Sequence, residues 1–501
     1  MGVWGCNTPK TTAFPSKNLH TSATPANRPG MDYISTRGSA PALDFAGATL
    51  AGLASDGGLY VPRAWPRFTE AEIAAMAGLP YAELAQRIMQ PFVGDSVGPE
   101  RLLELTRAAY GRFAHAAVTP LKQFDEQHWL LELFHGPTLA FKDVALQLLG
   151  LFFEEFLSKG DQNLTIVGAT SGDTGSAAID AVAGRAKVDI FMLHPKGRVS
   201  DVQRRQMTTV MAQNVHNIAV EGASFDDAQA MVKRMFNDPA MTGRFHIGAV
   251  NSINWARLMA QVVYYFAAAL QLGAPHRRIA FSVPTGNFGD VFAGYVAAQM
   301  GLPIERLIVA TNVNDILHRA LSSGDYSQGT VTPTAAPSMD IQVSSNFERL
   351  LFDLNGRDGV ALAAQMAGFE ATRAMTLTNA QREGATALFT SERADADDMA
   401  RAIRWAWDAA GDLIDPHTAI GLHAARKVAA GGLIDKAVPI VTLATAHPAK
   451  FPDAVERATG QRPELPKRVG DLFEREERCV DLPGDYAAVA DYVAAHATAR
   501  D

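Results

Sequence analysis

One lysine in this sequence stands where a reactive amine could be made. Lys142 follows Phe141 at the end of the loop 135–143, directly before a predicted helix. Apolar neighbours desolvate an ammonium group and lower its pKa, which is how a lysine becomes a nucleophile or a Schiff-base former. The positive end of the helix dipole also disfavours a cation at that place. The same position suits an ordinary surface lysine, so Lys142 alone leaves both interpretations open.

Two glycine-rich loops, 168–175 and 284–290, each connect a predicted strand to a predicted helix. Backbone N–H groups at a helix start can bind an anion without a basic side chain, and glycine allows a ligand to approach the backbone closely. Neither loop has the pattern of a P-loop or of a dinucleotide-binding turn. The first loop alone is better explained as a plain turn, but two such loops beside a lysine suggest one phosphorylated ligand and one carboxylate. The loops contain Thr170, Ser171, Gly172, Asp173 and Thr174, and Gly286, Asn287, Phe288, Gly289 and Asp290.

A further loop, 443–451, follows the last apolar strand and carries Thr445, His447 and Lys450. We interpret His447 as a loop histidine held by its own hydrogen bonds. Ligands of open α/β sheets bind at the carboxyl ends of the strands, so this loop is expected to meet the others there.

The elements that position these loops alternate between strands and helices from about residue 118 onwards. This alternation predicts βαβ units and mainly parallel sheets. The predicted strands are 129–134, 164–168, 188–193, 215–220, 279–283, 307–311 and 438–443. The predicted helices are 143–157, 174–182, 200–212, 225–236, 254–270, 288–300, 397–410 and 419–429, preceded by short helices at 70–76, 81–89 and 100–109.

Composition excludes several classes of protein. The chain has 501 residues, 48% of them hydrophobic and 20% charged, which is typical of globular proteins of two to four domains. The net charge of −8 argues against a nucleic-acid binder, and no apolar run is long enough to span a membrane. Two cysteines, Cys6 and Cys479, cannot form a disulfide framework or a zinc knuckle, and no metal site is expected. We therefore expect a soluble cytoplasmic enzyme.

Four segments are predicted along the chain. Residues 1–30 lack acidic residues and are interpreted as a disordered extension or a wrongly assigned start. An N-terminal domain is expected at 31–115, a catalytic region of two subdomains at 116–465, and a C-terminal segment at 466–501.

Taken together, the motifs resemble the pyridoxal-phosphate enzymes of fold type II, and more closely the threonine synthase family. The resemblance extends from Met31 to about residue 460. The segments that carry it are 33–38, 52–62, 135–143, 168–175, 194–200, 251–257, 284–290, 338–349 and 445–451. It implies two mainly parallel open-sheet αβα subdomains with an additional N-terminal module.

The resemblance also implies roles for the loops. Lys142 would hold pyridoxal 5'-phosphate through a Schiff base and move protons at the substrate carbons. Thr445 would bind the pyridine nitrogen, and the loop from Thr170 to Thr174 would bind the substrate α-carboxylate. The cofactor phosphate would be surrounded by Gly286, Asn287, Phe288, Gly289 and Asp290. Lys196, Arg198, Arg257 and Lys450 are candidates for the substrate phosphate, and we retain Arg257 and Lys450.

The reaction implied by the resemblance converts O-phospho-L-homoserine and water to L-threonine and phosphate, by a carbon–oxygen lyase acting on phosphates. Two alternatives stay open. One is a serine/threonine dehydratase or another fold type II lyase, which needs no second phosphate pocket. The other is a non-catalytic protein that binds a phosphorylated ligand. A nicotinamide oxidoreductase is disfavoured because no dinucleotide fingerprint follows any strand. The oligomeric state, monomer or homodimer, is left open.

Overall fold

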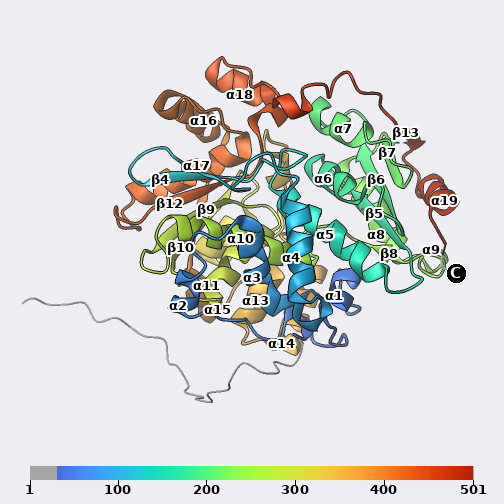
Figure 1. The fold of residues 1–501 in the computed structure, drawn as a ribbon, viewed down its shortest axis with the longest axis horizontal. Helices are drawn as coiled ribbons and strands as arrows, with labels where there is room; N and C mark the ends of the chain where they lie inside the picture. The colour runs from blue at the N-terminus through green and yellow to red at the C-terminus, as the bar shows by residue number, and fades with distance from the viewer. Residues whose placement is uncertain (1–30, 500–501) are drawn as a thin grey trace, which may run out of the picture.

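Two open sheets organise the chain (Figure 1). A six-stranded sheet has the order β11-β10-β9-β12-β4-β3 and is parallel except for its edge strand β3. A five-stranded sheet has the order β13-β7-β6-β5-β8 and is parallel throughout. An antiparallel pair, β1 and β2, lies in the N-terminal part. This architecture confirms the predicted fold class.

The computed structural model describes residues 31–499, so the predicted extension 1–30 and Cys6 lie outside the described residues. The strands are β1 (Tyr33–Ser35), β2 (Tyr60–Pro62), β3 (Leu121–Gln123), β4 (His128–Glu132), β5 (Leu164–Ala169), β6 (Val188–Pro195), β7 (Val215–Glu221), β8 (Ile247–Gly248), β9 (Ile279–Pro284), β10 (Ile304–Thr311), β11 (Phe389–Arg393), β12 (Ile440–Ala444) and β13 (Val480–Pro483).

The α-helices are α1 (Phe45–Ala51), α2 (Glu70–Ala74), α3 (Tyr81–Val93), α4 (Pro99–Tyr110), α5 (Lys142–Leu157), α6 (Asp173–Val182), α7 (Asp201–Thr208), α8 (Phe225–Phe236), α9 (Pro239–Thr242), α10 (Trp255–Gln271), α11 (Gly289–Gln299), α12 (Ile316–Ser323), α13 (Phe347–Leu354), α14 (Gly359–Thr372), α15 (Asn379–Thr386), α16 (Ala396–Ala410), α17 (Pro416–Ala430), α18 (Pro452–Thr459) and α19 (Tyr486–His496). Short 3₁₀ turns occur at η1 (Gly94–Ser96), η2 (Pro337–Met339), η3 (Pro448–Lys450) and η4 (Lys467–Val469).

Helices α5 and α10 join the two halves of the molecule. Helix α5 packs against α6 of the five-stranded half and against α10, which in turn packs against α11 of the six-stranded half. The N-terminal helices α3 and α4 cover α10 and α5 respectively. One continuous core therefore includes Phe92 of α3, Phe152 of α5, Ile190 of β6 and Val309 of β10. The N-terminal module shares this core instead of forming one of its own.

Most of the predicted elements lie within a few residues of the observed ones, but several regions differ. Helix α3 continues to Val93 through Pro91, whereas the prediction ended at residue 89. Proline removes a helical hydrogen bond, yet burial of Phe92 and Val93 in the core outweighs this loss. No helix or strand was predicted between residues 312 and 396, where the structure has the helices α12, α13, α14 and α15 and the strand β11. The C-terminal segment also contains β13 and α19.

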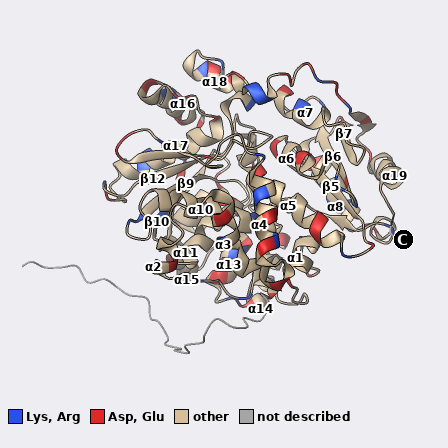
Figure 2. Ribbon diagram, viewed as in Figure 1, with Lys and Arg blue, Asp and Glu red and all other residues tan. Residues whose placement is uncertain are grey.

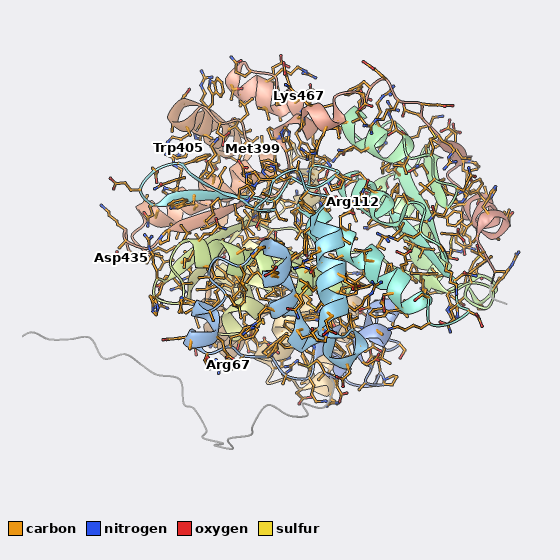
Figure 3. The ribbon with its side chains drawn as sticks, viewed as in Figure 1. Arg67, Arg112, Met399, Trp405, Asp435 and Lys467 are labelled. Atoms are coloured by element: carbon orange, nitrogen blue, oxygen red, sulfur yellow. The ribbon has the colours of Figure 1, made fainter. Side chains whose placement is uncertain are left out.

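Charged side chains of both signs are interspersed over both halves of the molecule (Figure 2). Exposed residues such as Arg67, Asp435 and Lys467 lie at the periphery, while side chains fill the space between the helices and the sheets (Figure 3). Within residues 31–499, no helix is both long and apolar enough to cross a membrane.

Candidate active site

A cavity of about 540 Å³ lies where the predicted loops meet. Strand β12 lies between β9 and β4 in the six-stranded sheet, so the three loops that follow these strands are neighbours. The loop after β5 of the other sheet and the segment around η2 also line the cavity. Of the predicted site residues, those that line it are Lys142, Thr170, Ser171, Thr174, Arg257, Gly286, Asn287, Phe288, Gly289, Asp290 and Thr445. Gly172, Asp173 and Lys450 do not line it.

The Lys142 loop and the Thr445 loop are bound to each other through their backbones. The Phe141 N–H donates to the Thr445 carbonyl at 2.8 Å, and the His447 N–H donates to the Leu139 carbonyl at 3.0 Å. Lys142 is 8% exposed, and its Nζ lies 4.9 Å from the centre of the Phe141 ring. Burial lowers the pKa of Lys142, although the neighbouring Asp173 carboxylate acts in the opposite direction. The lysine is thus held in the desolvated setting that its sequence neighbours predicted.

Thr445 offers a neutral hydroxyl to the same cavity. It is 6% exposed, directly follows β12, and its Oγ1 has no hydrogen-bond partner among the described residues. A hydroxyl in this state is free to donate to, or accept from, a ligand atom.

The loop before α11 forms an anion cradle from backbone groups. The carbonyl groups of Gly286 and Asn287 accept hydrogen bonds from Ser344 and Asn346, at 2.8 and 2.9 Å. Within residues 31–499 the N–H groups of Gly286, Asn287 and Phe288 have no acceptor, and they precede the first turn of α11. A Cβ on Gly286 would lie 2.5 Å from the Ser338 carbonyl oxygen, so no other residue fits there. These features fit a phosphate bound at a helix N-terminus.

Asp290 is placed to anchor this cradle. Its Oδ1 accepts hydrogen bonds from the hydroxyls of Tyr264 and Tyr265 on α10, the latter at 3.2 Å. Its Oδ2 is buried and has no hydrogen-bond partner in the described part of the chain. Burial raises the pKa of Asp290 to about 7, so about half of the carboxyl groups are protonated at neutral pH. A neutral carboxyl repels an anion in the cradle much less than a carboxylate does.

The loop before α6 is tightened by its own hydroxyl. Thr170 Oγ1 accepts from the N–H groups of Gly172 and Gly175, at 2.9 and 2.8 Å. Gly172 has a φ of 132° and packs against Gln203, which excludes a side chain. Ser171 and Thr174 face the cavity at the N-terminus of α6, where a carboxylate is favoured.

Arg257 supplies a buried cation to the cavity. It is 3% exposed and its Nη1 donates to the Val250 carbonyl at 2.9 Å, while its Nε has no partner within residues 31–499. Burial lowers its pKa to about 10, which leaves the guanidinium charged at neutral pH. A buried guanidinium with an unused N–H requires an anion, which is in keeping with the predicted role of Arg257.

Lys450 does not have the surroundings expected of a substrate-phosphate ligand. It is 0% exposed and lies outside the cavity lining. Its Nζ contacts Asp173 Oδ1 at 2.9 Å, the Thr138 carbonyl at 2.7 Å and Gln206 Oε1 at 2.9 Å. An ammonium group has three donors, and all three are used. We therefore withdraw the expectation that Lys450 binds substrate.

The other cationic candidates, Lys196 and Arg198, do not line the cavity. Lys196 is exposed and pairs with Glu221 and Asp481, each at 2.8 Å. Arg204 and Arg205 on α7 both pair with Glu477 and so connect α7 to the C-terminal segment. Cys479 carries a free thiol, and residues 31–499 contain no cluster of side chains that could hold a metal ion.

Several polar residues of the cavity were not singled out from the sequence. His417 accepts a hydrogen bond from the Ser338 N–H at 3.2 Å and pairs with the buried Asp415 at 2.8 Å. Gln261 lies one turn after Arg257 on α10, and its Oε1 has no partner. The only sequence signal for Gln261 was this four-residue spacing, which places both side chains on one helix face.

Comparison with known proteins assigns this arrangement to a family. Three family models match the chain: "Threonine synthase N terminus" at residues 32–110, "Pyridoxal-phosphate dependent enzyme" at 113–388 and "Threonine synthase, C-terminal" at 418–493. The threonine synthase of Pseudomonas aeruginosa is 56% identical over 467 residues, covering 93% of this chain and 98% of the relative.

Solved structures agree. The PLP-bound threonine synthase of Brucella melitensis has a TM-score of 0.90 at 50% identity, over 93% of this chain and 99% of that chain. The yeast threonine synthase has a TM-score of 0.88 at 38% identity, over 93% and 98%.

Fold and site thus define a pyridoxal-phosphate-dependent enzyme. More narrowly, the chain belongs to the threonine synthase family. The resemblance noted in the sequence is confirmed by these matches.

Proposed function

We propose that this enzyme converts O-phospho-L-homoserine and water to L-threonine and inorganic phosphate, with pyridoxal 5'-phosphate carried on Lys142. The observation that carries this proposal is the presence of two separate sets of anion donors beside Lys142 in one cavity. One set is the backbone cradle at Gly286–Phe288, and the other is the buried guanidinium of Arg257. A dehydratase or a β-replacing lyase would need only the first set for its phosphate.

The residues of the cavity fit the cofactor. The cradle would hold the phosphate of the cofactor. Lys142 would bond to its aldehyde carbon, and the Thr445 hydroxyl would form a hydrogen bond with its ring nitrogen. When bound, pyridoxal phosphate supplies an electron sink that stabilises negative charge at substrate carbons.

The chain's own groups would do the remaining work. The Ser171 and Thr174 hydroxyls and the start of α6 would orient the substrate carboxylate. Once released as a free amine, Lys142 would accept protons from the substrate carbons and return them. Its low pKa, caused first by burial, favours the neutral form needed for that task. Arg257 would hold the phosphate group at the far end of the substrate until it leaves.

The direct test is the formation of threonine and inorganic phosphate from O-phospho-L-homoserine by the purified, cofactor-loaded protein. Serine and threonine are supplied in parallel, and 2-oxo acid formation is measured. We expect phosphate and threonine in equal amounts and little 2-oxo acid. Release of 2-oxo acid from serine or threonine without reaction of the phosphorylated substrate would instead assign a dehydratase, and binding without turnover would assign a ligand-binding protein.

The role of Arg257 is tested by comparing Arg257→Met with Arg257→Lys. Loss of a buried charge-assisted contact should raise KM for O-phospho-L-homoserine by about 10- to 100-fold in the Met variant. The Lys variant keeps the charge and should recover part of this loss. If the Met variant retains the KM of the unmodified enzyme, the substrate phosphate binds elsewhere.

A further inference from the structure

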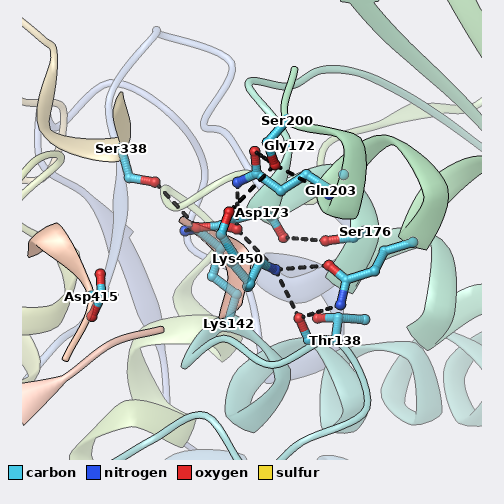
Figure 4. A network of polar contacts seen from close by, with 12 residues as sticks. Thr138, Lys142, Gly172, Asp173, Ser176, Ser200, Gln203, Ser338, Asp415 and Lys450 are labelled. Atoms are coloured by element: carbon cyan, nitrogen blue, oxygen red, sulfur yellow. Dashed lines mark hydrogen bonds and ion pairs between the residues drawn. The ribbon is translucent and has the colours of Figure 1, made fainter. Parts of the chain in front are cut away.

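Two buried lysines share one carboxylate beside the cavity (Figure 4). Asp173 Oδ1 lies 2.9 Å from Lys450 Nζ, whereas Asp173 Oδ2 lies 3.6 Å from Lys142 Nζ. The carboxylate is thus firmly bound to the lysine outside the cavity and only loosely paired with the lysine inside it. Asp173 itself is 3% exposed, so water screens neither pair.

The Asp173 carboxylate is fixed in this position by neutral donors as well. Gln203 Nε2 donates to Oδ1 at 2.8 Å, and Ser338 Oγ donates to Oδ2 at 3.4 Å. Burial alone would raise the pKa of Asp173, but the charges of Lys450 and Lys142 outweigh burial and hold the pKa well below its usual range. The group is a permanent anion at physiological pH.

Lys450 is held from three directions. Besides Asp173, its Nζ donates to the Thr138 carbonyl and to Gln206 Oε1. Gln206 also donates to the Thr138 carbonyl at 3.0 Å, and Thr138 leads into the Lys142 loop. Lys450 therefore connects η3, which follows the six-stranded sheet, with α6 and α7 of the five-stranded half.

We propose that Lys450 is a positioning residue: it binds the Asp173 carboxylate closely, so that the Lys142 amine is not drawn into a tight ion pair and stays free to capture a carbonyl group. This inference deepens the proposed function, because it rests on Lys142 as the residue that carries the cofactor.

Capture requires a free amine. In such a step the lone pair of a neutral Lys142 Nζ would attack a carbonyl carbon, a C=N bond would replace the C=O bond, and the oxygen would leave as one water with the two amine protons. An ammonium has no lone pair for this step, so whatever stabilises the ammonium slows capture. A carboxylate that is paired with no other cation and lies close to Lys142 would strongly stabilise its ammonium form.

Among the charged groups around Lys142, Lys450 is the one that most directly offsets the attraction of Asp173. The groups that act on it are Asp173 on α6, Lys450 in η3, Arg257 on α10 and Asp290 on α11, and His417 on α17 acts on Asp173 in turn. After burial, the attraction of Asp173 is the largest influence on the pKa of Lys142, and it opposes burial. Without Lys450, nothing of positive charge except Lys142 would contact Asp173 directly among the described residues.

The test compares Lys450→Met with the unmodified full-length protein, both freed of cofactor. Lys142 is labelled with trace acetic anhydride over a series of pH values, and the acetylated peptide is quantified by mass spectrometry. We expect the midpoint of Lys142 labelling to rise by about one pH unit or more in the variant. Capture of added pyridoxal phosphate at neutral pH, followed by absorbance, should slow about tenfold, in line with the smaller fraction of free amine.

Three controls separate positioning from general damage. Lys427→Met removes an exposed lysine that pairs with Glu392 at 2.7 Å, and it should leave the Lys142 midpoint unchanged. Lys450→Arg keeps the charge and should keep the midpoint near that of the unmodified protein. In an Asp173→Asn background, Lys450→Met should shift the midpoint much less, because no carboxylate is left to trap Lys142. Circular dichroism and thermal unfolding show that each variant has folded.

An unchanged or lower midpoint in Lys450→Met overturns the inference. An equal shift with and without Asp173 also overturns it, because Lys450 would then act by direct repulsion alone. If the unmodified protein is labelled normally but never captures pyridoxal phosphate, the proposed function fails, and the labelling midpoints still decide the role of Lys450.

Discussion

The lysine side and the glycine side of the cavity deal with buried charge in different ways. On the lysine side, Asp173 is ionised, the Lys450 ammonium pairs with it closely, and the Lys142 amine lies beside it at a longer distance. On the glycine side, free N–H groups replace cations, and burial drives the Asp290 carboxyl toward its neutral form. A reactive amine gains and loses a proton during a reaction. Neighbouring ionised side chains can compensate for this change in charge. A phosphate that is only held needs fixed dipoles, which the backbone provides.

The largest effect is expected from removing the amine itself. Lys142→Ala should lower threonine formation by at least about a thousandfold, because covalent attachment and proton transfer are both lost. The visible absorption of the cofactor-loaded protein should disappear with it. Lys427→Met is the matched control and should keep both properties. A Lys142→Ala protein that retains the visible band would show that another group carries the cofactor.

On the glycine side of the cavity, we expect a steric clash, and not a change of charge, to weaken cofactor binding. In Gly286→Ala the new Cβ would lie 2.5 Å from the Ser338 carbonyl oxygen, which is a backbone atom and cannot rotate away as a side chain can. Overpacking of about 1–3 kcal/mol predicts about 5- to 150-fold weaker binding of pyridoxal phosphate. Gly368→Ala is the control, because a Cβ on Gly368 meets nothing within 4 Å. Equal cofactor affinity in the two variants would exclude Gly286 from the cradle.

The two carboxyl groups should also respond oppositely to pH. The pKa of Asp290 is raised in the folded protein to about 7, so the folded state binds more protons than the unfolded chain between about pH 4 and pH 7. Its contribution to stability is full below pH 4 and is lost as pH rises through 7.

Asp290→Asn should therefore remove a downward slope of up to about 1.4 kcal/mol per pH unit in the free energy of unfolding. Urea titrations of both proteins across this pH range measure the slope. Asp173 has a lowered pKa, so its contribution is present above its ordinary pKa and is lost only in strong acid. An identical pH slope in Asp290→Asn and the unmodified protein would mean that Asp290 is already ionised.

The smallest effect is expected from breaking an exposed ion pair that, like Lys450–Asp173, joins a lysine to a carboxylate. Lys427→Met breaks the pair with Glu392 and should change the free energy of unfolding by less than about 1 kcal/mol. Chemical denaturation measures this change. A loss of several kcal/mol would show that burial is not what distinguishes the two pairs.

The same contrast explains which parts of the site could be predicted from the sequence. The cradle and the Lys142 loop are local motifs, in which a strand end, a turn and a helix start lie within about ten residues, and local rules describe them well. The surroundings of Lys450 are different, because Gln206 lies 244 positions away and Thr138 lies 312 positions away. No local pattern shows whether such a lysine faces a ligand or an internal carboxylate. The surroundings of Lys450 could therefore not be predicted from the sequence.

The fold shows a similar division. Strands such as β5 and β9 are continuous apolar runs and were predicted with small boundary errors. Strand β11 is the edge strand Phe-Thr-Ser-Glu-Arg, of which only Phe389 is buried, so it lacks the apolar signal. Helix α14 buries only Leu362 and Phe369, and its small apolar residues elsewhere blur the helical period.

The position of β12 has a consequence for biosynthesis. This strand, Ile440–Ala444, lies between β9 and β4, yet a ribosome makes it well after both of them. Until β12 is made, β9 and β4 each keep an unpaired edge, which is prone to aggregation, and the Lys142 loop lacks its backbone hydrogen bonds to the Thr445 loop. The surroundings of Lys142 are therefore completed only once β12 and its loop have been made, and partial chains should depend on chaperones that shield strand edges.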